Sequence, residues 1–264
     1  MDIAIGRFTA QIERPRALKF ALPIVLVPEM FTTRMHQATL IGYLANSGWQ
    51  VYAPDFRAAA GRGETPAIGR LDFGGLSALV GEAIAALERD VIVMGHGIGG
   101  LTALAIAERP RVRAAIALAP ALPRFPTPLL LRPATLFALL RRAALKPPRG
   151  KRLSEFLADA ESFQRPGLIK GLVADAGRSA LETARGRVRI PRFTEAAPRL
   201  IVVGDSDPFA PLPQVRIFAG EIGARLVTLA GRGHWIIGAR AVDRVVSEAE
   251  RFLLRTLDPE LLLA

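Results

Sequence analysis

Short apolar runs alternate with segments of helical periodicity along most of the chain. Residues 24–27 are all apolar and lie between Pro23 and Pro28, as expected for a strand buried on both faces. Similar runs predict strands at residues 49–53, 90–94, 112–118, 200–203 and 225–229. Apolar residues spaced three to four positions apart predict helices at residues 36–46, 71–88, 98–108, 213–222 and 239–257. This alternation predicts an α/β fold, a mostly parallel central sheet with helices on both faces.

Two segments depart from this regular alternation. Residues 2–20 alternate weakly and predict one or two edge strands, and residues 54–70 are rich in Gly, Arg and Pro and predict a loop. Residues 120–198 have helical periodicity and no strand pattern, so we expect a helical insertion over the carboxyl ends of the strands. The predicted organisation is a core domain of residues 1–119 and 199–264 with a helical cap, or lid, of residues 120–198.

The composition is that of a large soluble domain. The chain has 264 residues, is 50% hydrophobic and contains no cysteine. We therefore expect one sizeable core and a reducing, cytoplasmic location without disulfides. The first residues do not resemble a secretion signal, and the apolar runs are too short to span a membrane.

Positive charge is concentrated in the expected cap. The net charge is +11, and residues 120–198 contain 15 Lys and Arg against 6 Asp and Glu. This asymmetry favours an anionic or acyl small molecule as the partner, and no nucleic-acid module accompanies it. Apolar residues 129–131 and 136–140 precede Arg141, Arg142 and the basic residues 146–152, which predicts a lid helix with a solvated basic end. Contact of this lid with a membrane surface is the less favoured alternative.

A glycine-rich turn between a strand and a helix marks the candidate site. The sequence Gly95-His96-Gly97-Ile98-Gly99 follows the apolar run ending at Met94 and precedes a helix of small residues. Glycines at such a turn let the chain make a sharp corner. The pattern resembles the nucleophile elbow G-x-S-x-G of the α/β-hydrolases, with Gly97 at the position of the serine.

Two further segments support a resemblance to the α/β-hydrolase fold over nearly the whole chain. Gly204-Asp205-Ser206-Asp207-Pro208 follows a buried strand and is similar to the segment that carries the family's catalytic acid. Gly231-Arg232-Gly233-His234-Trp235 is similar to the loop that carries the catalytic histidine. The resemblance therefore implies an Asp207–His234 pair, with Asp205 as the alternative acid, in the family's chain order.

The resemblance also implies an oxyanion hole formed by two backbone N–H groups. We assign these to Ile98, which follows the elbow, and to Met30, which follows the apolar run ending at Val27. Glu29 lies beside this position, where a carboxylate opposes developing negative charge unless it turns away or pairs with an arginine such as Arg34. This second departure from the family pattern weakens the case for ester hydrolysis.

Three other residues complete the expected surroundings of the pocket. His96 is expected to point into the scaffold and to be structural. His36 and Trp235 are expected to lie around the pocket with Glu29, His36 near its mouth.

Loss of the serine leaves three functional hypotheses open. Removing this nucleophile from a well-studied serine protease costs roughly a million-fold in turnover, so an acyl-serine route is closed. In the first hypothesis, His234, oriented by Asp207, acts as a general base on water or substrate in hydrolysis or a lyase step. In the second, the protein is an inactive hydrolase that binds a ligand; in the third, Gly97 replaces the serine of an active esterase. No pattern in the sequence predicts a metal or a cofactor.

Overall fold

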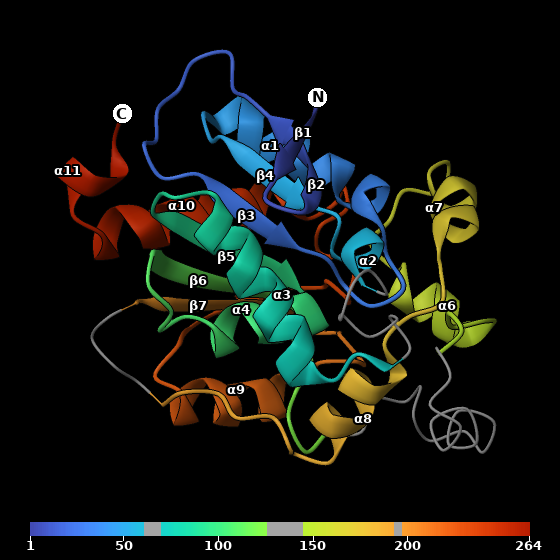
Figure 1. Ribbon diagram of the computed structural model, residues 1–264. Coiled ribbons are helices and arrows are strands. Elements are labelled where there is room, and N and C mark those ends of the chain that lie inside the picture. The colour runs from blue at the N-terminus through green and yellow to red at the C-terminus, as the bar shows by residue number, and fades with distance from the viewer. Residues whose placement is uncertain (61–69, 126–144, 193–196) are drawn as a thin grey trace.

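The computed structural model describes residues 1–60, 70–125, 145–192 and 197–264 (Figure 1). Its centre is an eight-stranded sheet in the order β1-β2-β4-β3-β5-β6-β7-β8. The strands are β1 (Asp2–Ile5), β2 (Phe8–Glu13), β3 (Ile24–Val27), β4 (Val51–Pro54), β5 (Val91–His96), β6 (Val112–Leu118), β7 (Arg199–Gly204) and β8 (Arg225–Leu229). The pairs β1–β2 and β2–β4 are antiparallel, and all other neighbours are parallel. The predicted mostly parallel sheet is confirmed.

Helices cover both faces of this sheet (Figure 1). One face carries α1 (Ala38–Ser47), which follows the short 3₁₀ helix η1 (Arg34–Gln37), and α10 (Val242–Thr256). The other carries α3 (Phe73–Ala86), α4 (Ile98–Ala105) and α9 (Leu212–Glu221). In β3, Ile24 and Leu26 pack with α1 and α10, whereas Val25 and Val27 pack on the opposite face. Alternate residues of a strand point to opposite faces, so an all-apolar strand serves two cores.

The predicted loop at residues 54–70 begins with a short helix that the sequence analysis missed. Helix α2 (Phe56–Ala59) follows β4 directly. The Asp55 carboxylate caps it by accepting a hydrogen bond from the Ala58 N–H at 2.8 Å. An Asp before a short apolar stretch is a helix-start signal, and the Gly and Arg residues that follow obscured it. Residues 61–69 lie outside the described part.

The segment between β6 and β7, called the cap here (residues 120–198), is helical where it is described. It contains α6 (Lys151–Phe156), α7 (Arg165–Gly171) and α8 (Gly177–Ala184), which lie together along one side of the molecule (Figure 1). Within its described residues the only β-structure is an isolated bridge between Leu145 and Asp175. The apolar segments 129–131 and 136–140 and the pair Arg141–Arg142 lie outside the described residues. Lys151 and Arg152, part of the basic cluster, pair with Glu155 within the cap.

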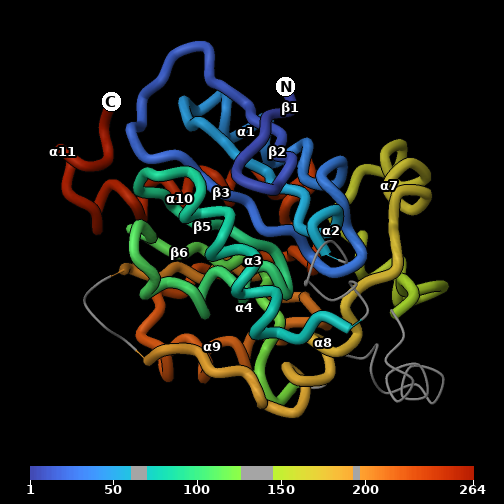
Figure 2. Tube along the Cα trace, viewed as in Figure 1, coloured from blue at the N-terminus to red at the C-terminus, as the bar shows by residue number. Residues whose placement is uncertain are grey.

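The connection between β2 and β3 packs against the C-terminal residues. The connection between β2 and β3 arches toward the C-terminal helix α11 (Pro259–Leu262), as the chain trace shows (Figure 2). Ala21 N–H donates to the carbonyl of Leu262 at 2.8 Å, and the Phe20 ring stacks on Trp49 with centroids 3.7 Å apart. In the described part of the chain, no helix combines the length and the apolar character needed to cross a membrane.

Glycines of the turn after β5 let helix α4 lie directly against the strands. A Cβ atom added at Gly95 would lie 2.2 Å from the Gly99 carbonyl oxygen, and one added at Gly99 would lie 2.3 Å from the Val27 carbonyl oxygen. These neighbours are backbone atoms and cannot move aside like a flexible side chain. The glycines therefore fix the position of the corner residue Gly97 relative to β3.

Substituting Gly99 by alanine should destabilise the protein, because the methyl group has no space. We expect Gly99→Ala to lower the free energy of unfolding by about 1–3 kcal/mol or more, as overpacking does. Gly42→Ala is the matched control, because Gly42 is inside helix α1 and its Cβ meets nothing within 4 Å. The control should gain about 0.5–1 kcal/mol from helix propensity. Urea denaturation of both variants measures this, and equal stabilities would contradict the packing.

Candidate active site

Four strands of the sheet end at the same edge and deliver the candidate residues there. Glu29 follows β3 and Gly97 follows β5, while Asp207 and His234 follow β7 and β8. The strands β3, β5, β6, β7 and β8 are parallel neighbours, so their carboxyl ends meet. Open α/β sheets bind ligands at this edge.

Asp207 and His234 are in direct contact. Asp207 Oδ2 accepts a hydrogen bond from His234 Nδ1 at 2.9 Å. Its Oδ1 accepts the N–H groups of Phe209 at 2.7 Å and Ala210 at 3.2 Å. The alternative acid Asp205 is exposed and accepts the Gly231 N–H at 2.9 Å, so it shapes the turn and does not face the histidine. Asp207 is therefore the residue that orients the His234 ring.

Gly97 occupies a sharp corner, as the elbow pattern predicts. Its φ is 53° and its ψ is −116°, a conformation that favours glycine. Its N–H donates to the carbonyl of Leu118 at 2.9 Å, and its carbonyl accepts the N–H of Leu101 at 3.1 Å and of Ala121 at 3.0 Å. Strand β6, helix α4 and the start of the cap thus fix the corner.

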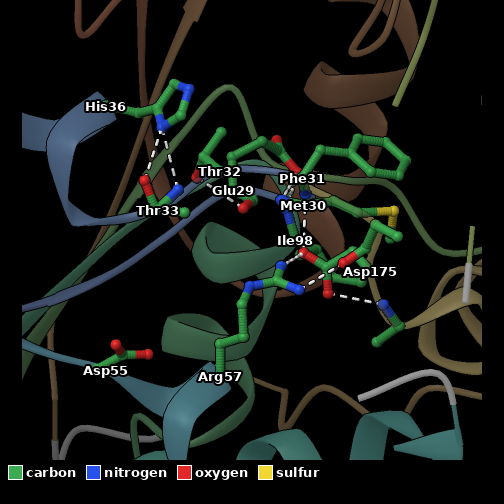
Figure 3. A network of polar contacts seen from close by, with 12 residues as sticks. Glu29, Met30, Phe31, Thr32, Thr33, His36, Asp55, Arg57, Ile98 and Asp175 are labelled. Carbon is green, nitrogen blue, oxygen red and sulfur yellow. Dashed lines mark hydrogen bonds and ion pairs between the residues drawn. The ribbon is translucent and has the colours of Figure 1, made fainter. Parts of the chain in front are cut away.

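The Glu29 carboxylate fills the space above Gly97. A Cβ atom added at Gly97 would lie only 1.1 Å from Glu29 Oε2. The same oxygen accepts a hydrogen bond from His234 Nε2 at 3.2 Å. Oε1 accepts the N–H of Met30 at 2.5 Å and of Ile98 at 3.3 Å, the two donors assigned to the oxyanion hole. Figure 3 shows Glu29, Met30 and Ile98 gathered at this point. Glu29 is only 7% exposed.

Glu29 lies in the pocket, and it neither turns away from the oxyanion donors nor pairs with Arg34. Arg34 pairs with Asp2 at 2.8 Å, close to the surface. Glu29 turns inward because the missing side chain at residue 97 leaves room, and because three N–H donors converge on that room. The sequence contains both departures, Gly97 and Glu29, but their complementarity depends on how the loop after β3 folds over the corner.

The buried charges give His234 an unusual affinity for protons. Burial alone lowers the pKa of His234, but Asp207 and Glu29 together outweigh burial and raise this pKa to about 10. Burial also opposes ionisation of Asp207, yet the charge and hydrogen bond of His234 bring the pKa of Asp207 below its ordinary value. At neutral pH the site therefore contains a protonated imidazole between two carboxylates.

The remaining candidate residues, His96, His36 and Trp235, are buried around the site. His96 Nε2 lies 2.8 Å from the His234 carbonyl oxygen, and burial followed by the charge of His234 lowers the pKa of His96 to about 4. His36 is buried, with Nε2 at 2.9 Å from the Leu168 carbonyl oxygen, and burial lowers its pKa. Trp235 packs against His96 and Phe156. Neither His36 nor Trp235 lines the two cavities at Glu29, where the sequence analysis expected them.

Two cavities meet at Glu29. The inner one, beside Gly97, has a volume of about 50 Å³. Its walls are mainly apolar and include four aromatic rings that the sequence analysis did not identify, Phe31, Phe125, Phe156 and Phe209. The outer one, about 440 Å³, shares Glu29, Met30 and Ile98 with it. No pattern in the sequence marks these phenylalanines, because they come from segments far apart in the chain.

Glu29, His96 and His234 also form the group in the described residues that most resembles a metal site. One ligand atom from each lies within 4.8 Å of the others, and all three residues are buried. Two ligands of one zinc ion are at most about 4.2 Å apart, twice a Zn–N bond of roughly 2.1 Å. Hydrogen bonds already join Glu29 to His234 and His234 to Asp207. We therefore assign these residues to a hydrogen-bonded site.

Comparisons with known proteins agree with this architecture. Residues 24–248 match the model of the alpha/beta hydrolase family. A monoacylglycerol lipase from Paleococcus ferrophilus is 20% identical, with a TM-score of 0.68 over 94% of this chain and 99% of that one. An enol-lactonase from Burkholderia xenovorans is 20% identical, with a TM-score of 0.69 over 96% and 100%. No curated protein sequence is significantly similar.

His234 should titrate at a much higher pH than His36 and His96. At pH 7 we expect His234 to be protonated and His36 and His96 to be neutral, because the pKa of His234 is about 10 and that of His96 is about 4. Long-range ¹H–¹⁵N NMR of the imidazoles measures this directly, since the chain has 3 His. Glu29→Gln should lower the pKa of His234, because it removes one of the two carboxylates that raise it.

The same shift predicts how stability depends on pH. A histidine whose pKa is higher in the folded state stabilises the protein fully below its unfolded value of about 6.5, and this contribution is lost as pH rises toward 10. The unfolding free energy of the wild type should therefore fall more steeply between pH 7 and 10 than that of Glu29→Gln. Parallel curves would show that Glu29 does not interact with His234.

Proposed function

Because the chain belongs to the alpha/beta hydrolase family, we propose that it is a hydrolase in which the Glu29 carboxylate acts in place of the serine. One observation carries this proposal: the carboxylate occupies the space above Gly97, within hydrogen-bond distance of both His234 and the two oxyanion-hole donors. Carboxylates are known covalent nucleophiles in enzymes.

The occupied oxyanion hole limits the kind of bond that Glu29 can attack. Glu29 Oε1 already accepts the Met30 and Ile98 N–H groups, so a substrate carbonyl oxygen has no free donors there. Attack on an ester carbonyl would lack the stabilisation that such donors give to the oxyanion. Displacement at a saturated carbon develops no oxyanion. We therefore infer a substrate with a leaving group on an sp³ carbon, such as an alkyl halide or an epoxide.

The reaction then has two balanced steps. In the first, a lone pair of Glu29 Oε2 forms a bond to the substrate carbon, and the carbon–leaving-group bond breaks with its electron pair, giving an alkyl ester of Glu29. An epoxide oxygen, released as an alkoxide, takes the Nε2 proton of His234. A halide departs as the anion, and the Nε2 proton then passes to solvent. In the second, His234 takes a proton from water, and the resulting hydroxide adds to the ester carbonyl. The Met30 and Ile98 N–H groups stabilise the oxyanion on Oε1. The alcohol then leaves with the proton from His234. The carboxylic acid formed from Glu29 gives its proton to His234, which restores the carboxylate and the protonated imidazole of the starting state.

The protonation of His234 explains why a direct general-base mechanism is less favourable. With Glu29 ionised, the pKa of His234 is about 10, so Nε2 carries a proton at neutral pH and cannot accept one from water. Esterification removes the negative charge of Glu29 and with it part of what raises this pKa. His234 then becomes a base only after the first step, when one is needed.

The walls of the inner cavity favour an apolar substrate. The volume of this cavity, about 50 Å³, is close to that of one or two water molecules, so a longer substrate extends into the outer cavity of about 440 Å³. The only ionisable residues among the described walls of the inner cavity are Glu29 and His234. No described Lys or Arg reaches it, which gives no support to an anionic head group at this position.

Two alternatives predict no such chemistry. In a ligand-binding protein without activity, Glu29 simply fills the oxyanion hole; the fact that its carboxylate satisfies all the donors of the site favours this reading. In an esterase that lost its serine by substitution, the original side chain at residue 97 must coexist with Glu29. The 1.1 Å separation between a Cβ there and Glu29 Oε2 argues against that history.

Trapping the alkyl ester tests the proposal. We expect His234→Gln, incubated with 1-bromobutane or 1,2-epoxybutane, to gain the mass of one substrate-derived group on Glu29, because the variant cannot activate water. Intact-protein and peptide mass spectrometry measure the adduct. Glu29→Gln in the same background is the control and should gain no mass. Absence of an adduct with both electrophiles, together with ligand binding in calorimetry, would favour the inactive alternative.

Restoring a serine tests whether Gly97 and Glu29 are complementary. Gly97→Ser alone should remain unlabelled by a fluorophosphonate, because the new side chain overlaps Glu29 Oε2. Gly97→Ser combined with Glu29→Ala should be labelled, since it opens the slot and leaves Asp207 and His234 in contact. Equal labelling of the two variants would mean that Glu29 does not occupy the serine position.

A further inference from the structure

A carboxylate from the cap contacts the loop that forms half of the oxyanion hole. This loop, residues 29–32, is called the oxyanion loop here. Asp175 lies between α7 and α8, and its Oδ2 accepts the N–H of Phe31 at 2.7 Å (Figure 3). A second hydrogen bond has its donor in the cap: the Val173 N–H donates to the Phe31 carbonyl at 2.9 Å. Both the N–H and the carbonyl group of Phe31 are thus hydrogen-bonded to the cap.

These bonds support a strained backbone. Phe31 has a φ of 68°, a left-handed conformation that costs a bulky residue about 1–3 kcal/mol. Such a residue keeps its conformation only when its surroundings impose it. The bonds from Asp175 and Val173 supply that constraint, and Phe31 itself is buried.

The fixed backbone of Phe31 also restricts the Met30 N–H, the oxyanion donor next to it in the chain. The Met30 N–H belongs to the peptide unit whose carbonyl is that of Glu29. Thr32 anchors this carbonyl twice, through its N–H at 3.2 Å and its hydroxyl at 2.8 Å. Phe31, between the two anchored units, sets their relative orientation. A rotation at Phe31 therefore turns the Met30 N–H away from Glu29 Oε1.

Asp175 is itself fixed by its neighbours. It is 8% exposed, its Oδ1 accepts the Ala176 N–H at 2.6 Å, and Leu145 bonds to both sides of its backbone at 2.9 Å. Arg57, on helix α2, forms an ion pair with Oδ2 and also donates to the Ala174 carbonyl. The core thus contributes the cation, the cap contributes the anion, and the oxyanion loop lies against the pair (Figure 3).

We propose that Asp175, whose negative charge is balanced by the Arg57 guanidinium, is a positioning residue that orients the Met30 N–H toward the oxyanion hole. The inference rests on the proposed function and deepens it. An oxyanion forms only when water attacks the Glu29 ester, so Asp175 acts on the second step. The first step, displacement at saturated carbon, needs Glu29 but no oxyanion stabilisation.

Rapid-quench mass spectrometry of a single turnover separates the two steps. For Asp175→Asn we expect ester hydrolysis to slow by about tenfold or more, since misplaced donors or reacting groups cost 10²-fold or more in other enzymes. Ester formation should change by less than about threefold. Arg57→Gln leaves the Asp175 carboxylate in place and should slow hydrolysis in the same direction, so it serves if Asp175→Asn does not fold.

Glu182 offers a matched control within the cap. Its Oε2 accepts a core N–H, that of Phe73 at 3.1 Å, and its Oε1 pairs with Arg178 at 3.3 Å. Glu182→Gln therefore removes a comparable charge between cap and core, but the Glu182 carboxylate bonds to Phe73 and Arg178 and not to the oxyanion loop. It should leave both steps unchanged. Equal slowing of both steps in Asp175→Asn, or equal effects of Asp175→Asn and Glu182→Gln, would overturn the positioning role.

Hydrogen–deuterium exchange tests the positioning role of Asp175 without a measurement of activity. The amides of residues 30–32 should exchange faster in Asp175→Asn and Arg57→Gln than in the wild type or Glu182→Gln. If no ester forms in any variant, the proposed function fails, and the exchange data alone decide the positioning role. Unchanged exchange at residues 30–32 would overturn it.

Discussion

The structure of the site depends on satisfying one buried carboxylate. A carboxylate removed from water costs several kcal/mol unless hydrogen bonds and an opposite charge compensate. Glu29 obtains both, from the N–H groups of Met30 and Ile98 and from the protonated ring of His234. A side chain at residue 97 would overlap the Glu29 carboxylate in this position. The glycine at the corner and the glutamate after β3 are therefore two halves of one feature.

Several parts of the fold hold the Glu29 carboxylate in place. Glycines 95 and 99 bring helix α4 against β3 and β5, which places the Ile98 N–H at the site. Asp207 fixes the His234 ring through its other nitrogen, Nδ1. The cap contributes Asp175, which supports the strained Phe31 next to the second donor. Core and cap thus meet at the oxyanion loop, and a change in either is expected to reach the same two N–H groups.

Much of the fold and part of the site could be predicted from the sequence, because they depend on local pattern. Apolar runs and glycine spacing locate the strands and the corner at Gly97, and short segments with fixed geometry after β7 and β8 locate Asp207 and His234. The direction of the Glu29 side chain could not be predicted, since it depends on space left by a residue 68 positions away. Asp175 and the phenylalanines of the inner cavity were missed for the same reason: they reach the site only through tertiary packing. His36 was placed near the pocket mouth, but its ring turns toward Leu168 and is buried there.

The origin of the oxygen in the product tests the central claim most directly. A single turnover of excess wild-type enzyme with 1-bromobutane in H₂¹⁸O should yield butanol containing ¹⁶O, because the alcohol oxygen comes from the Glu29 carboxylate. Mass spectrometry should then find one ¹⁸O atom in the peptide that contains Glu29. Butanol labelled with ¹⁸O in the first turnover, with Glu29 unlabelled, would mean that water attacks the substrate directly and would contradict the nucleophilic role of Glu29.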